Sequence, residues 1–150
     1  MDEEQKKVLG RLGEACARRE HCVGDVRTKA LKALGGDAQR AAEVVDSLIE
    51  DGFVDDLRYA SAFAREKSAL SGWGPVKIRF ALRAKGIGAS EIDGAMAGID
   101  EDKAMERLDK VLRTKASALS GDPQIRMKLI KFALSRGYSY EDVRKHMDKY

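Results

Sequence analysis

Three aspartates close together are the first residues whose types and spacing suggest chemistry. The stretch DGFVDDLRYASAF, residues 51–63, holds Asp51, Asp55 and Asp56 beside an arginine and aromatic residues. Paired carboxylates serve as general acids and bases or as ligands for metal ions. However, Asp55 and Asp56 are neighbours at a predicted helix start, so their side chains diverge, and no histidine is near them in sequence. We therefore predict no catalytic residues and no enzymatic activity.

The thiols and imidazoles do not indicate a metal centre. Cys16 and Cys22 are six positions apart and form no CxxC pair, and with His21 they provide only three ligands on one short stretch. The other histidine, His146, is far away in sequence. Structural zinc sites need four ligands at short, regular spacings. We expect reduced, structural cysteines, no metal and no cofactor.

The composition indicates a folded, all-helical protein. The 150 residues are 43% hydrophobic and 35% charged, which is too apolar for a disordered chain and too charged for a membrane protein. Alanine, leucine, lysine, arginine and glutamate dominate, and these residues favour helices. The first ten residues, MDEEQKKVLG, contain no apolar signal region, so we expect a cytoplasmic protein that makes no membrane contact.

The net charge is only +3, but the charges are unevenly distributed. Every charged residue from Ala41 to Asp56 is acidic, whereas residues 65–90 carry six basic side chains and one acid. Residues 110–136 carry seven basic side chains and one acid, Asp122. Basic later parts suggest a polyanionic or acidic partner, although lysine and arginine also solvate ordinary helix faces.

A repeat of about 50 residues runs through the chain. Gly35, Gly86 and Gly137 are spaced by 51 residues each, and each follows an amphipathic stretch. Glycine just past a helix end adopts the left-handed conformation that closes the helix. The sequence SALSG also occurs twice, each time shortly before one of the two prolines, Pro75 and Pro123. Proline is well tolerated as the first residue of a helix.

Apolar residues recur with helical spacing, and no window shows the alternation of a half-buried strand. We predict three tandem repeats of three helices each, with repeats over residues 1–52, 53–99 and 100–150. The expected helices cover residues 3–20, 23–34, 38–51, 56–70, 75–85, 90–98, 101–119, 123–136 and 140–148. One unit of this size is marginal alone, so we expect the repeats to stack into an elongated, curved array, as a monomer.

The acidic stretch then has a structural interpretation. Gly52 closes one helix, and Phe53 packs back on Leu48 as in a Schellman ending. Asp55 caps the next helix, and Asp56 adds negative charge to its first turn. The segment is therefore a stop, a turn and a start.

The same region carries a resemblance to a known family. GFVDDLRYASAFAREKSALSGWGPVKIRFALRAKGI, residues 52–87, resembles the central signature of the RecX family, bacterial regulators of the RecA recombinase. Residues 17–31 resemble the first repeat of that family more weakly, with Cys22 in place of the usual serine cap. The structural signature residues are Gly52, Asp55, Asp56, Tyr59, Phe63, Gly74, Pro75 and Gly86.

The resemblance implies a protein that binds RecA and its filament on DNA, lodges in the filament groove and inhibits recombinase, ATPase and coprotease activity. It places the chain in DNA repair, homologous recombination and the SOS response. We expect the contacts to come from a basic face: Arg58, Arg65, Lys67, Lys77, Arg79, Arg83, Lys85, Lys128 and Lys131.

A helix-turn-helix protein that contacts duplex or single-stranded DNA directly is the alternative. Residues 75–85 carry four basic side chains but no asparagine or glutamine, which fits backbone contact better than base readout. Trp73 stands between two glycines, where it either stacks on a base or packs over a repeat junction.

Overall fold

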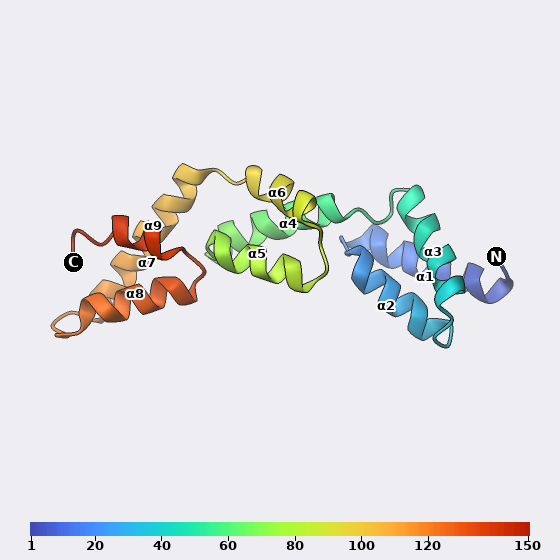
Figure 1. Cartoon of the computed structure of the whole chain (residues 1–150), viewed down its shortest axis with the longest axis horizontal. Helices are drawn as coiled ribbons and strands as arrows, with labels where there is room; N and C mark the ends of the chain where they lie inside the picture. The colour runs from blue at the N-terminus through green and yellow to red at the C-terminus, as the bar shows by residue number, and fades with distance from the viewer. The chain divides into compact units, whose positions relative to one another are not determined.

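The computed structural model describes all 150 residues and is all-helical (Figure 1). The nine helices are α1 (Glu3–Arg18), α2 (Val23–Ala33), α3 (Ala38–Glu50), α4 (Asp56–Ala69), α5 (Pro75–Ala84), α6 (Ala89–Ala97), α7 (Glu101–Ala118), α8 (Ile125–Ser135) and α9 (Tyr140–Lys145). Their order confirms three tandem groups of three helices. None of the nine is both long and apolar enough to cross a membrane.

The chain divides into two compact units. The first unit comprises Met1–Ala62 with Arg83–Ala95, and the second comprises Phe63–Leu82 with Met96–Tyr150. The division passes through the middle repeat, so each unit contains one complete outer repeat and part of the middle one.

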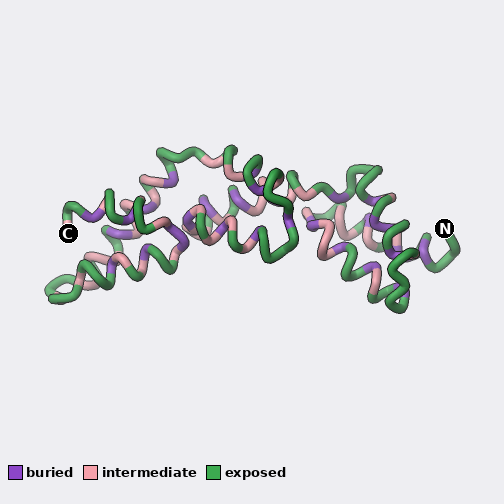
Figure 2. Tube along the Cα trace, in the orientation of Figure 1, coloured by how far each residue is buried: buried purple, intermediate pink, exposed green.

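The core of the first unit lies among α1, α2 and α3, where buried positions recur along each helix (Figure 2). Val44, Val45 and Leu48 are almost fully buried on one face of α3, at the spacing that the sequence predicts. They pack in one cluster with Val8 of α1 and Val26 of α2. The first repeat is therefore a three-helix bundle around a single aliphatic core.

The core of the second unit joins α7, α8 and α9. Leu108 and Leu112 of α7 and Leu129 of α8 have no exposed surface, and Val143 of α9 is equally buried. Tyr138 closes this cluster, and its hydroxyl donates a hydrogen bond to the Gly72 carbonyl (3.2 Å). Burial raises the pKa of the Tyr138 hydroxyl. The third repeat is thereby tied to the loop that precedes α5.

The glycines of the 51-residue repeat have the predicted role. Gly35, Gly86 and Gly137 have φ angles of +66°, +79° and +96°, a region that favours glycine. The Gly137 amide donates to the Leu134 carbonyl (3.0 Å), and the Tyr138 amide donates to that of Ala133 (3.3 Å). These two bonds form a Schellman ending, which confirms the expected helix stop.

The main chains of Gly74 and Gly137 lie close together in the second unit. The Gly74 amide donates to the Arg136 carbonyl (2.8 Å), and the Val76 amide donates to that of Gly137 (2.9 Å). A side chain on Gly74 would meet the Gly137 carbonyl group at 2.4 Å. The orphan carbonyls at the end of α8 thus satisfy orphan amides at the start of α5.

Several predicted boundaries were wrong. Pro123 was expected to begin a helix, but α8 begins at Ile125 with Gln124 as its cap. The Asp122 carboxylate instead accepts from the Gln124 amide (2.8 Å), which makes residues 122–124 a turn. Some helix ends are also shorter than predicted, since α1 ends at Arg18 and α9 at Lys145. Beyond α1 the chain becomes extended at Arg19, whereas before α8 it forms a turn.

Candidate partner-binding surface

Asp55 and Asp56 each occupy a helix N-terminus. The Asp55 carboxylate accepts from the Arg58 amide (2.9 Å) and caps α4, as predicted. Asp56, at the first position of α4, accepts from the Val23 amide (2.8 Å), which is the first amide of α2. The two neighbouring carboxylates therefore serve two different helices.

This arrangement also explains why a cysteine is tolerated at the start of α2. Cys22 is the N-cap residue, but its side chain makes no capping hydrogen bond to a main-chain amide of α2. Asp56 supplies the acceptor from elsewhere in the chain. The Cys22 side chain is fully buried, and burial raises the pKa of its thiol.

The Schellman ending at Gly52 is confirmed. The Gly52 amide donates to the Ile49 carbonyl (3.0 Å), and the Phe53 amide donates to that of Leu48 (2.9 Å). Phe53 and Leu48 lie together over Gly13 of α1, at 3.9 Å from where a side chain would begin. The segment 51–56 is a helix joint, as the sequence indicates.

Several of the basic residues expected at the partner surface form ion pairs within their own unit, among them Arg58, Lys85 and Lys128. Arg58 pairs with Glu20 (2.7 Å) and also donates to the carbonyl of Gly52 (3.0 Å). Lys85 pairs with Asp25 (3.0 Å), and this bond raises the pKa of Lys85. Both pairs are half-exposed and direct their charge to carboxylates of the first unit.

Lys128 is the third. It pairs with Asp122 in the turn before α8, and this hydrogen bond lowers the pKa of Asp122. Its charge is directed to a carboxylate of the same unit.

Lys67 and Lys77 instead lie over an aromatic ring. Their ammonium groups are 4.9 Å and 4.5 Å from the centre of the Trp73 ring. Lys67 also lies 5.6 Å from the ring of Phe63, which meets Trp73 edge-on. Such cation–π contacts orient the ammonium groups without neutralising them. Trp73 thus packs at the junction of α4 and α5 and holds two positive charges there.

The other expected residues are spread over α4, α5 and α8. Arg65, Arg83 and Lys131 are exposed, and Arg79 is half-buried. Arg83 belongs to the first unit, whereas the other three belong to the second. Within the second unit, Arg65, Lys67 and Lys77 come from the helices that flank Trp73.

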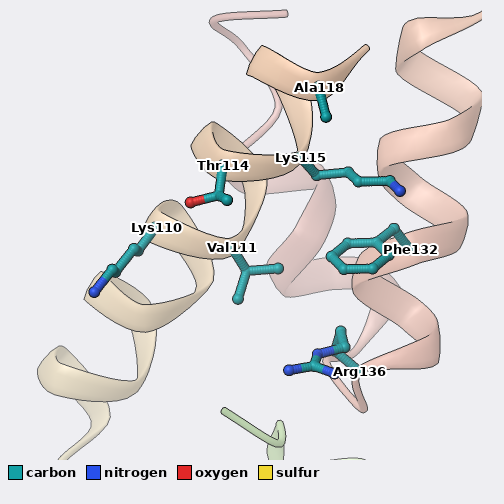
Figure 3. Close-up of a pocket in the computed structure, with 7 residues that line it drawn as sticks. All are labelled: Lys110, Val111, Thr114, Lys115, Ala118, Phe132 and Arg136. Atoms are coloured by element: carbon teal, nitrogen blue, oxygen red, sulfur yellow. The ribbon is translucent and has the colours of Figure 1, made fainter.

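A second group of cations in the third repeat was not among the residues chosen from the sequence. Lys110 and Lys115 of α7 and Arg136, which follows α8, line a hollow together with Phe132 (Figure 3). The guanidinium of Arg136 also donates to the Ser71 carbonyl (3.1 Å), in the loop that carries Trp73. The excess of basic residues over positions 110–136 was the sequence feature that indicated this group. Positions 111, 115 and 118 have helical spacing, which predicts that their side chains share one face of the helix.

Among the 150 residues, no group of three or more His, Cys, Asp or Glu side chains is arranged to hold a metal ion. The nine helices, the glycine-centred repeat and the junctions between repeats define a tandem three-helix repeat protein.

Comparison with known families names the repeats. Residues 55–96 match the family model "RecX, second three-helix domain", and residues 100–147 match "RecX, third three-helix domain". The two matches together cover more than half of the chain.

Whole-chain relatives agree with these matches. Regulatory protein RecX of Pseudomonas entomophila is 34% identical over 126 residues, covering 83% of this chain and 79% of the relative. Regulatory protein RecX of Xanthomonas campestris is 31% identical over 141 residues, covering 94% and 85%. The chain spans only 56% of the length of the Clostridium tetani relative, at 32% identity. The chain belongs to the RecX family.

Solved structures support the fold. The crystal structure of RecX from Lactobacillus salivarius superposes with a TM-score of 0.85, covering 99% of this chain and 97% of that one, at 18% identity. A crystal structure of regulatory protein RecX gives a TM-score of 0.84 at 22% identity, covering 97% and 72%. At these identities the likeness establishes the fold alone.

Proposed function

We propose that this protein regulates a RecA-type recombinase by binding RecA and the RecA–DNA filament, and that it lowers recombinase, ATPase and coprotease activity without catalysis of its own. The observation that carries the proposal is family membership over most of the chain, since the relatives are named regulatory proteins. The roles of Asp55 and Asp56 support the non-catalytic part of the proposal, because both carboxylates accept hydrogen bonds from amides at helix N-termini.

The partner surface that we propose is on the second unit. It is defined by Arg65, Lys67, Lys77 and Lys131. A filament presents DNA phosphates and protein carboxylates, and cations that lack a carboxylate partner of their own attract such groups. Lys67 and Lys77 meet this condition, because their ammonium groups lie over the Trp73 ring rather than against a carboxylate. Arg58, Lys85 and Lys128 are assigned to internal ion pairs, and Arg83 is a candidate on the first unit.

Direct base reading by α5 is disfavoured. A recognition helix reads base edges with its N-terminal residues, which must therefore be accessible. Here the amides of Gly74 and Val76 bond to the carbonyls of Arg136 and Gly137, so the third repeat occupies that helix end. Non-specific contact with DNA phosphates remains compatible with the surface and is proposed as a secondary activity.

The test is a titration of the protein into RecA assembled on single-stranded DNA, with ATP hydrolysis followed by a coupled assay. We expect inhibition that saturates near stoichiometric amounts. Unchanged hydrolysis at a molar excess over RecA would reject the proposal. A parallel measurement of duplex affinity, against a random-sequence control, tests the DNA-reader alternative. A preference of about a thousandfold would favour that alternative, since specific sites usually gain at least this much.

A further inference from the structure

A hollow of about 320 Å³ lies between α7 and α8 in the second unit. Its apolar lining comes from both helices: Val111 and Ala118 from α7, and Phe132 from α8. Val111 and Lys115 point from α7 toward the ring of Phe132 (Figure 3). Apolar side chains that face an open hollow offer surface to an apolar group of a ligand.

Cations surround this apolar lining, and no acid contributes to it. The ammonium group of Lys115 is 4.8 Å from the centre of the Phe132 ring, and the guanidinium carbon of Arg136 is 5.9 Å from it. The hydrogen bond of Arg136 goes to the Ser71 carbonyl, and its Nε is buried without a partner. The hollow therefore combines an apolar floor with a guanidinium that no carboxylate neutralises.

The basic residue after α5, Lys85, has a carboxylate partner that Arg136 after α8 lacks. Lys85 follows α5 as Arg136 follows α8, and Lys85 pairs with Asp25 at the third position of α2. The third position of α5 is Lys77, not an acid. Arg136 thus lies at a junction where the internal carboxylate has been replaced by another cation. A ligand carboxylate would complement the charge at this junction.

We propose that this hollow binds an acidic peptide segment with an apolar anchor residue. The anchor side chain rests on Val111, Ala118 and Phe132, and a neighbouring carboxylate binds Lys115 and Arg136. Arginine is well suited to this contact, because its planar guanidinium can bind a carboxylate through two parallel hydrogen bonds. The inference rests on the proposed function, since it specifies how a protein partner is contacted.

Single-stranded nucleic acid fits the same hollow less well. A base would have to stack on Phe132, but Lys115 and Arg136 already lie over that ring. Among the lining residues, Thr114 supplies the one neutral polar side chain for a base edge, and it points away from Phe132 (Figure 3). The hollow offers charge and apolar surface rather than base-edge contacts.

The experiment measures fluorescence anisotropy with the full chain and a short labelled peptide, without RecA. The peptide carries one phenylalanine flanked by aspartate and glutamate. We expect saturable binding that Lys115→Glu weakens at least about tenfold, since the change removes a charge-assisted contact and places a like charge beside the peptide carboxylate. Arg144→Glu is the matched control, because it changes the net charge equally on exposed α9, and we expect binding within about twofold of the parent.

Three further probes make each outcome decisive. A peptide with serine in place of the apolar anchor, and one with asparagine and glutamine in place of the acids, must each bind more weakly. Equal binding of either overturns the proposal, as does an absence of binding by the parent peptide. Oligothymidylate is the third probe, and if it binds more tightly and depends on Lys115, the hollow is a nucleic-acid site instead. Because RecA is absent, failure here is distinguishable from failure of the ATPase titration.

Discussion

The main chain of Gly74 lies directly against that of Gly137, where a side chain at position 74 would come within 2.4 Å of the Gly137 carbonyl group. Two main-chain hydrogen bonds span the same contact, from Gly74 to Arg136 and from Val76 to Gly137. The start of α5 and the end of α8 thus complete each other's hydrogen bonding. Glycine is required at position 74 for space, and at position 137 also for its positive φ angle.

Replacing Gly74 with alanine should therefore destabilise the second unit. We expect a loss of about 2–3 kcal/mol, near the upper end of the usual cost of overpacking, because the obstacle is main chain that cannot rotate away. Urea unfolding followed by Trp73 fluorescence measures it, since the tryptophan is in the same unit and next to the substitution.

Gly10→Ala is the matched control for this substitution. Gly10 lies within α1, and nothing approaches within 4 Å of the position of its added side chain. Alanine there should gain about 0.5–1 kcal/mol from helix propensity, which urea unfolding followed by circular dichroism measures because Gly10 and Trp73 belong to different units. Equal effects of the two substitutions would contradict the close contact between α5 and α8.

A second prediction concerns the cap that Asp56 provides to α2. Asp56→Ala removes the acceptor for the Val23 amide and should cost about 1 kcal/mol, the usual value for a lost N-cap. Asp56→Asn keeps a carbonyl oxygen in place and should retain most of that stability. Urea unfolding followed by far-ultraviolet circular dichroism compares the two. If alanine and asparagine were equivalent, the contact between α4 and α2 would contribute nothing.

These two contacts show what the sequence made predictable and what it did not. Helix ends could be predicted because a glycine that closes a helix, or an N-cap such as Asp55, bonds to a group within about five residues of it in the sequence. The Val23–Asp56 and Gly74–Gly137 contacts join segments far apart in the chain, so no local pattern reveals them. Asp56 was predicted only to favour its own helix, and its bond to Val23 became visible in the structure.

The same distinction applies to the basic residues. Their enrichment after residue 65 is a property of composition, and it was read directly from the sequence. Whether a given lysine is paired depends on side chains brought together by folding. Lys85 meets Asp25 from another repeat, whereas Lys77 meets Trp73, although both lysines lie on or next to the same helix. The role of Arg136 could not be predicted from the sequence, because the residues that line the hollow with it come from two helices.

The Lys85–Asp25 pair gives a prediction about pH. Burial tends to raise the pKa of Asp25, but its hydrogen bonds to Lys85 and Cys22 prevail and hold that pKa below the ordinary value. A depressed carboxyl pKa stabilises the folded state above the unfolded-state pKa of about 3.9, and this stabilisation disappears as pH falls through the folded-state pKa. Asp25→Asn should thus cost less than about 1 kcal/mol at pH 6, because the pair is half-exposed, and almost nothing near pH 2.

Urea unfolding at several pH values, followed by circular dichroism, measures this difference. Asp46→Asn is the control, since Asp46 is exposed on α3 and makes no ion pair. The gap between Asp25→Asn and the parent protein should close as the pH is lowered, while that for Asp46→Asn stays small throughout. A gap that widens in acid would have the wrong sign for a stabilising carboxylate.

The last prediction concerns the two lysines over Trp73. If they contact the filament, Lys67→Glu combined with Lys77→Glu should weaken inhibition of RecA ATPase at least about tenfold, because attraction to phosphates and carboxylates becomes repulsion. The fold should survive, since each cation–π contact at an accessible site contributes only about 0.5–1 kcal/mol. Lys29→Glu with Lys32→Glu changes the net charge equally on exposed positions of α2 and should leave inhibition within about twofold. Equal losses in the two double variants would indicate a response to net charge alone, and would remove the surface around Trp73 from the proposed contact.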